Sequence, residues 1–277
     1  KVRLVSVNPG ERNYHVFYHL LYGASNETLE KLHLKRDPKL YKILSISGQY
    51  DVNKNFDDVS LYKELVEAFK ILNFTDEEIL QTFRVIASIL LIGNVDFNDK
   101  EPCEIIKDES LIKNICDLIN TTPDLLEQAF QFRLIENAGK VSQSRIPQRN
   151  NVMSGKNSFA KDLYDRLFKW IVNKLNEGLS NNSDSSKIKY VGLLDIFGFE
   201  CFEHNGIEQF CINFTNEKLQ QIFISDVFKA DEVEFKNQGL AEFLGEIHFK
   251  DNKRIIELMD NKNQPNGLFQ IIDNKSV

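Results

Sequence analysis

The sequence has few of the residues that mark a secreted or membrane protein. Its cysteines form no C-x-x-C pair and no zinc-binding spacing, so we expect reduced thiols; a Cys201–Cys211 disulfide is the disfavoured alternative. No apolar run approaches the roughly 20 residues of a transmembrane helix. The first residues also lack the apolar core and cleavage site of a signal peptide. These absences indicate a cytoplasmic protein.

The sequence also has fewer positively charged than negatively charged residues. The 34 Lys and Arg residues stand against 41 Asp and Glu residues, which gives a net charge of −7. A nucleic-acid surface normally needs a basic stripe, so we expect no nucleic-acid partner. With 277 residues and 42% hydrophobic content, the chain is long enough to bury the core of one large domain or two ordinary ones.

The most informative stretch runs from Val191 to Glu200. Residues 188–195 open with a nearly continuous apolar run, which is typical of a strand buried on both faces of an α/β sheet. The run ends at Asp195, and Gly198 follows three residues later. In P-loop nucleotidases an acid so placed reaches Mg²⁺, and a glycine amide approaches the γ-phosphate because no Cβ obstructs it. The bare D-x-x-G pattern is weak, but the strand before it strengthens the interpretation.

A phosphate-binding loop is missing from the sequence. No stretch matches G-x-x-x-x-G-K-[ST], the loop that cradles phosphates. Gly155-Lys156 is followed by Asn157, and Gly139-Lys140 is followed by Val141. We therefore expect that this chain cannot hold ATP by itself in the usual way. The first residue is not Met and both ends fall near apolar segments, so we expect a piece of a longer chain.

Hydrophobic periodicity and capping signals predict a mainly helical chain. Thr75 and Glu78 have the spacing of a capping box at the start of a buried helix. The polar, basic stretch 139–155 is expected to be an exposed loop, and 95–97 with 104–106 could form a short hairpin. The predicted helices are 13–22, 57–72, 75–91, one opening at 122–123, 158–179 and an unusually long one at 207–235.

Several motifs, in order along the chain, resemble those of the myosin motor. Residues 195–200 (DIFGFE) and 213–221 (NFTNEKLQQ) resemble switch II and the relay helix. Residues 8–18 resemble the segment that follows switch I, and 159–170 resemble the long helix after the actin-facing loop. Residues 90–97 resemble a further family block, although Leu91 stands where many members have histidine. The resemblance spreads over nearly the whole chain.

The resemblance implies a fold and a division of the chain. The fold would be part of the P-loop nucleotidase-type myosin motor, α/β and predominantly helical, with a buried central-sheet strand at 188–195. The phosphate loop and switch I would precede this chain, and the converter would follow it. The implied parts are 1–187, mostly the upper actin-binding subdomain; 188–205, sheet strand and switch II; 206–250, relay helix and relay loop; and 251–277, the start of the lower actin-binding subdomain.

The resemblance also assigns roles to residues of switch II and the relay. Asp195 would bind Mg²⁺ through water, and the Gly198 amide would bond the γ-phosphate of ATP. Glu200 would pair with a switch I arginine that these residues do not include, so we expect it to be unpaired or to lie in an exposed loop. The long helix would transmit the switch movement toward the converter. Its matched relay residues are Asn213, Asn216, Glu217 and Phe223.

Two segments are implied to face F-actin. The first is the basic stretch 139–155 with Lys140, Arg145 and Arg149, since cations steer binding to acidic actin. The second is the segment that begins with Gly267 and Phe269. Light chains or calmodulin would bind outside these residues.

The leading hypothesis is part of an actin-based motor of the cytoplasmic actin cytoskeleton, which couples MgATP hydrolysis to force. These 277 residues alone would be inactive. One alternative is another P-loop switch protein, such as a GTPase or a kinesin-like motor. A second alternative is a non-catalytic actin- or partner-binding module derived from a motor. An intact phosphate loop upstream would favour the motor, and a degenerate one would favour the module.

Overall fold

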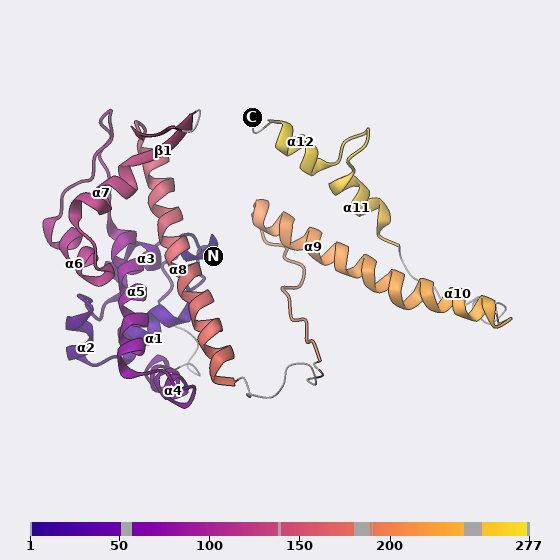
Figure 1. The fold of residues 1–277 in the computed structure, drawn as a ribbon, viewed down its shortest axis with the longest axis horizontal. Coiled ribbons are helices and arrows are strands. Elements are labelled where there is room, and N and C mark those ends of the chain that lie inside the picture. The colour runs from indigo at the N-terminus through magenta and orange to yellow at the C-terminus, as the bar shows by residue number, and fades with distance from the viewer. Residues whose placement is uncertain are drawn as a thin grey trace. The chain divides into compact units, whose positions relative to one another are not determined.

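The computed structural model describes residues 2–50, 57–137, 140–179, 189, 191–240 and 251–275. The chain divides into two compact units, Lys1–Asp184 and Ser185–Val277 (Figure 1). This division falls close to the predicted boundary between 187 and 188. Each unit is described by itself.

The first unit is built from helices and one hairpin. Its helix α8 runs beside α5, and the hairpin stands at the N-terminal end of α8 (Figure 1). The elements in chain order are η1 (Val2–Leu4), α1 (His15–Gly23), α2 (Asn26–Lys31), η2 (Pro38–Leu40), α3 (Lys42–Ser45), α4 (Asp58–Ile71), α5 (Asp76–Asn94), α6 (Glu109–Ile119), α7 (Pro123–Gln131), β1 (Phe132–Asn137), β2 (Lys140–Arg145) and α8 (Arg149–Leu179).

Helix α5 is the centre of this unit's hydrophobic core. It begins with the predicted capping box, in which the Glu78 N–H donates to Thr75 Oγ1 at 3.2 Å and the Thr75 N–H donates to Glu78 Oε2 at 2.8 Å. From Phe83 onward most of its side chains are buried, because α1, α3, α4, α6 and α8 surround it. Its neighbours contribute large buried side chains such as Phe17 and Tyr18 of α1.

Most predicted helices of the first unit are confirmed. Helices α1, α4, α5 and α7 lie where periodicity and capping placed them, and α8 contains the predicted helix 158–179. The predicted hairpin at 95–97 and 104–106 is reduced to one isolated bridge between Phe97 and Ile105.

The predicted exposed loop at 139–155 is wrong in its local structure. Strand β2 pairs antiparallel with β1, in a register from Phe132 opposite Arg145 to Asn137 opposite Lys140. Helix α8 then begins at Arg149. The stretch carries few apolar residues, so its sequence resembled a loop, but backbone hydrogen bonds between two strands do not require apolar side chains.

The second unit contains one long helical rod. Helix α9 (Ile207–Phe223), the π-helical turn η4 (Ile224–Lys229) and α10 (Ala230–Asn237) follow one another without interruption, which confirms the predicted long helix. Helices α11 (Lys253–Asp260) and α12 (Leu268–Lys275) complete the unit, and α11 packs on α9 (Figure 1). Residues 241–250, the last part of the expected relay helix and relay loop (206–250), lie outside the described residues.

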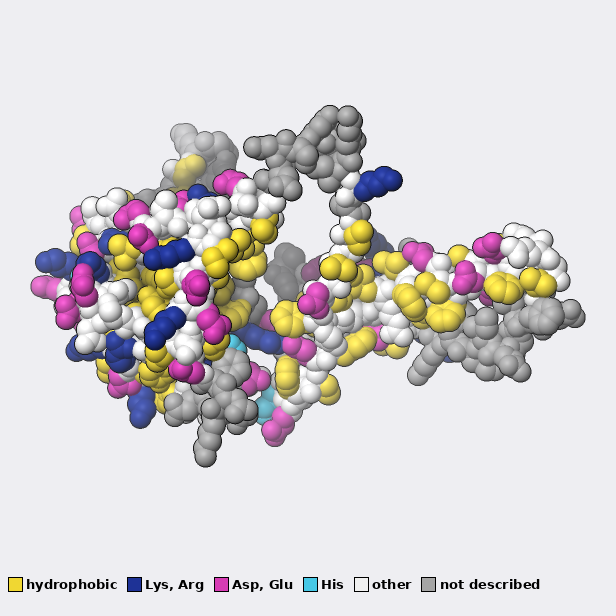
Figure 2. All heavy atoms as spheres, turned by 90° about the horizontal axis from the view of Figure 1, so that it is seen from below, with side chains coloured by type: hydrophobic (Ala, Val, Ile, Leu, Met, Phe, Trp, Pro, Cys, Tyr) yellow, Lys and Arg dark blue, Asp and Glu magenta, His cyan; other side chains and the backbone are white. Residues whose placement is uncertain are grey.

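The rod buries little of its apolar surface. Neither α9 nor α10 has a buried residue in the described structure, although their apolar residues recur at core spacing. Ile224 in the π-helical turn is 4% exposed, whereas Ile222 and Phe223 are more than half exposed. Figure 2 shows hydrophobic side chains spread over the surface of this unit. Periodicity therefore predicted the helix correctly but not its burial.

The predicted buried strand at 188–195 is not formed. The described residues of this stretch, 189 and 191–195, belong to no helix or strand. Leu193 is 94% exposed. A strand buried on both faces needs neighbouring strands and covering layers. In the part of the chain that the structure describes, the only sheet is β1–β2, whose strands pair with each other.

Two further predictions concern membrane spans and thiols. Across the described residues, no helix combines the length and apolar character needed to cross a membrane. All four cysteines are free; Cys103 and Cys116 are buried, whereas Cys201 and Cys211 are exposed.

Candidate functional site

The segment 195–200, which we call the acid–glycine motif, is hydrogen-bonded through Glu200 to the start of α9. The Glu200 N–H donates to Asn213 Oδ1 at 2.8 Å, and Asn213 Nδ2 donates to the Glu200 carbonyl at 2.8 Å. An amide side chain that both donates to and accepts from one residue fixes the distance and direction of that residue's backbone. Glu200 is thus fastened to the rod about one and two-thirds turns from its beginning at Ile207.

The carboxylate of Glu200 has a partner on the same helix. Gln209 Nε2 donates to Glu200 Oε2 at 3.2 Å, and the Gly206 N–H donates to Gln209 Oε1 at 2.8 Å. Gln209 therefore links the carboxylate to the N-terminus of α9. The expectation that Glu200 would be unpaired is wrong, because this nearby amide substitutes for a partner from outside the chain.

Asp195 and Gly198 remain open to solvent. Asp195 lines a hollow together with Ile212, Thr215 and Asn216 of α9. A Cβ placed on Gly198 would meet no heavy atom within 4 Å. Within the described structure, the buried Asn216 Nδ2 has no hydrogen-bond partner. The acid and the glycine therefore lie where a ligand could approach them, beside an amide with an unused donor.

The described residues supply one ligand for a divalent cation at this place. They contain no group of three or more His, Cys, Asp or Glu side chains that could hold a metal ion. Mg²⁺ commonly takes one or two carboxylates and completes its octahedron with water and substrate phosphates. Asp195 fits the part of such a single, water-mediated carboxylate, and it does not form a magnesium site by itself.

Glu217, one of the predicted relay residues, and its neighbour Lys218 connect α9 to α11 and the residue before it. The Glu217 carbonyl accepts a hydrogen bond from Asn252 Nδ2 at 2.8 Å, and its carboxylate accepts one from the same amide. Lys218 forms an ion pair with Asp260 at 3.2 Å. Phe223 makes an edge contact with Phe228 one turn further along the rod, at a ring separation of 5.8 Å.

Gly267 and Phe269, predicted to face actin, take part in contacts within the second unit. The Phe269 ring lies 4.9 Å from that of Phe210 and 4.8 Å from that of Phe214. Gly267 is buried, and its N–H donates to the Asn261 carbonyl at 2.7 Å. A Cβ there would come within 2.8 Å of the Met259 carbonyl oxygen, so the position requires glycine. A contact between these residues and actin stays a prediction.

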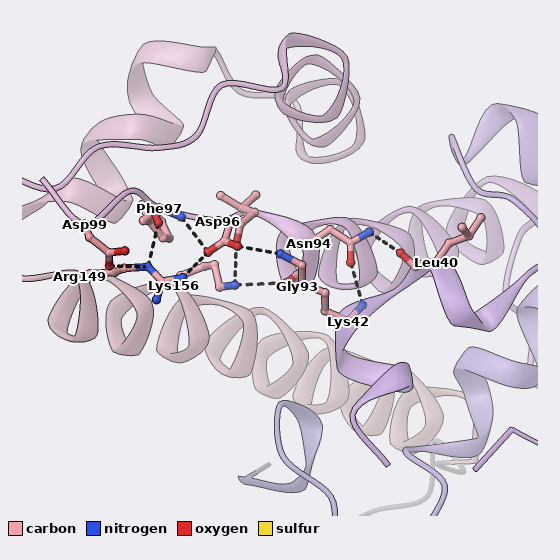
Figure 3. Close-up of polar contacts among 10 residues, drawn as sticks. Leu40, Lys42, Gly93, Asn94, Asp96, Phe97, Asp99, Arg149 and Lys156 are labelled. Atoms are coloured by element: carbon pink, nitrogen blue, oxygen red, sulfur yellow. Dashed lines mark hydrogen bonds and ion pairs between the residues drawn. The ribbon is translucent and has the colours of Figure 1, made fainter. Parts of the chain in front are cut away.

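The basic residues of 139–155 are tied to the segment that follows α5 (Figure 3). Arg149 Nη2 donates to Asp96 Oδ1 at 2.8 Å, and its Nε donates to the Phe97 carbonyl at 2.8 Å. Arg145 Nη2 donates to Gln131 Oε1 at 2.9 Å and lies 3.4 Å from Glu104 Oε1. Lys140 opens β2, and its side chain lies outside the described part.

A buried lysine, Lys156, lies on α8 near the same contacts. Its Nζ donates to the Gly93 carbonyl at 3.2 Å and to the Val95 carbonyl at 2.9 Å, and the residue is 3% exposed. Burial lowers the pKa of Lys156 to about 8, and the charge of Lys42 acts in the same direction. The lysine supplies donors to carbonyls at the C-terminal end of α5, which the helix itself leaves unsatisfied.

Asp96 joins three elements at this point. Burial raises the pKa of Asp96, but the hydrogen bonds from the Phe97 N–H, Arg149 and Lys42 outweigh it and lower the pKa to about 2. Lys42 Nζ, from α3, lies 3.1 Å from Asp96 Oδ2. Asp96 is therefore ionised throughout the physiological range and connects α3, the segment after α5, and α8.

Sequence reasoning missed the residues that hold these segments together. Gln209 follows Gly206 by three residues, a capping-box spacing that could have indicated it. The sequence places Lys156 beside a polar, basic stretch and gives no sign that its side chain is buried. Asp96 and Asn252 carry no local signal, because their partners lie far along the chain.

Comparison with known proteins defines the class of this chain. The family model for the myosin head (motor domain) matches residues 1–277. The match covers the whole chain, and several relatives exceed 30% identity. The chain belongs to the myosin head (motor domain) family.

The relatives are myosins, several of them named as unconventional myosins. The chain is 37% identical to unconventional myosin-Ih of Mus musculus over 279 residues, which align 100% of this chain with 28% of that protein. It is 38% identical to unconventional myosin-Ib of Homo sapiens over 285 residues, covering 100% of this chain and 24% of that protein. It is also 37% identical to myosin-1 of Saccharomyces cerevisiae, covering 100% of this chain and 14% of that protein. The chain thus spans about a quarter or less of these relatives' length.

Proposed function

We propose that this chain is part of an actin-based motor that couples ATP hydrolysis to force generation. The observation that carries the proposal is the pair of 2.8 Å hydrogen bonds between Glu200 and Asn213. They join the acid–glycine motif to the long helical rod, so a displacement of one displaces the other. Membership of the myosin head family supplies the context in which this junction would be switch II and relay helix.

The nucleotide step would use the open end of the motif. Asp195 would hold Mg²⁺ through water, and the Gly198 amide would donate to the γ-phosphate of ATP. Charge-assisted hydrogen bonds of this kind contribute about 1.5–3 kcal/mol. When the Gly198 amide moves toward the phosphate, the Glu200–Asn213 junction would pull on α9.

The rod would pass this displacement to the rest of the motor. Asn216, Glu217 and Phe223 lie along it, and Glu217 is bonded to Asn252 before α11. A helix buried on few sides can tilt without disrupting a core, which suits a transmitting element. The converter that would receive the movement, and the light chains or calmodulin that would bind beyond it, belong to the complete protein.

F-actin would be contacted by the β1–β2 hairpin of the first unit. Leu134 and Val141 are 70% and 64% exposed on it, and the register and strand alternation place them on one face of the hairpin. An exposed apolar patch of this kind suits a partner surface with an apolar centre. The protein would accordingly act at the actin cytoskeleton.

The test is a pair of glycine substitutions in the complete polypeptide that carries this sequence. In this structure neither Gly192 nor Gly198 has any heavy atom within 4 Å of an added Cβ, so the methyl group of G192A or G198A meets no steric obstacle within the chain. We expect G198A to lower actin-activated ATP hydrolysis by about 10- to 100-fold, because the amide can no longer reach the phosphate. G192A should leave the rate within about twofold.

Equal rates in the two variants would contradict the role of Gly198. A complete polypeptide that binds actin but hydrolyses no ATP would instead favour a non-catalytic actin-binding module.

A further inference from the structure

Two segments of the first unit run antiparallel and are joined by polar contacts at each step. Residues 93–104 leave the C-terminal end of α5, and residues 145–156 run from the end of β2 into α8. We call this arrangement the polar ladder; Figure 3 shows its contacts at Lys156 and Arg149. Its contacts, in order from the α8 side, are Lys156 with Gly93 and Val95, Arg149 with Asp96, Phe97 and Asp99, Pro147 with Cys103, and Arg145 with Glu104.

The ladder places cations on one segment and acceptors on the other. Its inner end is buried at Lys156, and its outer end is partly exposed at Arg145. Next to the Arg145 end, the contact is a backbone hydrogen bond, in which the Cys103 N–H donates to the Pro147 carbonyl at 3.2 Å. Because side-chain and backbone contacts both join the two segments, the segments cannot slide past each other without breaking several contacts at once.

The hairpin begins and ends at this ladder. The Ile146 N–H donates to the Gln131 carbonyl at 2.7 Å, which closes the hairpin at its base. Arg145 binds the Gln131 side chain at the same place, at 2.9 Å. Beyond this base, β1 and β2 pair with each other and carry the exposed Leu134 and Val141. The direction in which the hairpin projects is therefore set by the contacts of residues 145–149.

We infer that Arg145, Arg149 and Lys156 are positioning residues for the hairpin, and that the polar ladder sets the hairpin's orientation toward its partner. This inference deepens the proposed function, on which the identity of the partner rests. Under this inference, Arg145 and Arg149 support the hairpin from within the first unit, whereas the sequence predicted that they contact actin.

The geometry of Arg149 distinguishes support from direct contact. Its Nε and Nη2 both donate inward, to the Phe97 carbonyl and to Asp96, and its Nε also lies 3.6 Å from Asp99 Oδ1. A planar guanidinium can serve both acceptors at once, whereas a lysine ammonium on a flexible stem lacks that fork. An arginine that only supplied charge to a partner would tolerate replacement by lysine.

The first experiment measures hydrogen exchange of the β1–β2 amides in the 277-residue chain. R149K keeps the charge and loses the fork, so we expect the hairpin amides to exchange about tenfold faster. The matched control is R133K on β1; Arg133 is exposed and sits on the hairpin itself, so exchange should change less than twofold. D96N, which removes the acceptor's charge, should reproduce the effect of R149K. Unchanged exchange in both R149K and D96N would overturn the inference.

The second experiment measures F-actin affinity of the complete polypeptide at several salt concentrations. A positioning role predicts that R149K weakens binding about threefold or more while leaving the salt dependence unchanged, because no charge at the interface is lost. Unchanged affinity in R149K, together with a shallower salt dependence in R149Q, would show direct charge contact and overturn the inference. If the wild-type polypeptide does not bind actin, the proposed function fails, and the exchange measurement still decides whether the ladder positions the hairpin.

Discussion

At the scale of single residues, the most informative groups are those whose polar atoms are withdrawn from water. Lys156 is an example, because its ammonium is buried between two carbonyls of the α5 terminus. A neutral amine still has two N–H donors, which matches these two acceptors. The residue can therefore lose its proton without losing its hydrogen bonds, and burial favours that loss.

The first prediction concerns this lysine and pH. The folded chain releases the Lys156 proton near pH 8, whereas the unfolded chain holds it to about pH 10.5. Between these values the unfolded state binds more protons, so stability contributed by Lys156 rises with pH. We expect the free energy of unfolding of the wild type, minus that of K156M, to increase by up to about 3 kcal/mol across this window.

Urea unfolding at matched pH values would measure this difference in the free energy of unfolding. K156M serves as the control because it lacks the titrating group. A difference that stays flat from pH 8 to pH 10.5 would contradict the prediction.

At the scale of elements, short-range signals fixed the helix termini while long-range contacts set what the helices do. The start of α5 depends on Thr75 and Glu78. This pair lies within one four-residue stretch, which is enough to end a loop and begin a helix. Glu78 also binds Lys174 of α8 at 2.7 Å, so the same cap holds two helices together. The rod α9–η4–α10 shows the converse, since its helical pattern is strong and its burial slight.

The second prediction concerns the α5 cap. Thr75→Ala removes the oxygen that accepts from the Glu78 N–H and should cost about 1 kcal/mol of stability. Thr121→Ala is the matched control, because Thr121 precedes α7 without capping it. Chemical denaturation of both variants would test this. Equal losses in the two would indicate that the cap contributes nothing specific to α5.

At the scale of the whole molecule, the chain presents one densely packed unit and one that buries little. The first unit holds nearly all of the buried hydrophobic residues. Among the described residues of the second unit, Ile224 is the one buried hydrophobic side chain. The acid–glycine motif lies in the second unit, with Asp195 and Gly198 open. At this motif a nucleotide would therefore meet Asp195 and Gly198 but no loop that encloses its phosphates.

The third prediction follows from that arrangement. We expect the purified 277-residue chain to give no measurable heat of ATP binding in calorimetry with Mg²⁺ present. A phosphate cradle of backbone amides and a lysine supplies most of the contacts to a nucleotide in this class of site, and the sequence contains no such loop. Glu200, half-buried and bonded to Gln209, cannot replace it. Tight binding would refute the prediction; the complete polypeptide, titrated in parallel, is the positive control.

Much of this organisation could be read from the sequence because the signals are local. The helices α1, α4, α5 and α7 follow from apolar spacing and from caps such as Thr75 and Thr122, which act within one turn. The motif at 195–200 and its distance to Asn213 also lie within one short stretch, and they are among the motifs that carry the resemblance to myosin motors. The comparison confirmed that family.

The remainder depended on contacts between distant residues. The sequence by itself determined helices α1, α4, α5 and α7, the long rod, the family and the order of the motifs, because each depends on neighbours within a few positions. Only the tertiary structure decided that 140–145 pairs as a strand, that 191–195 stays exposed, and that Arg145 and Arg149 bind inward. Each of these depends on whether a partner 14 to 53 residues away, or a neighbouring strand, is in place to satisfy hydrogen bonds and cover apolar surface. Residue type and spacing alone do not specify that.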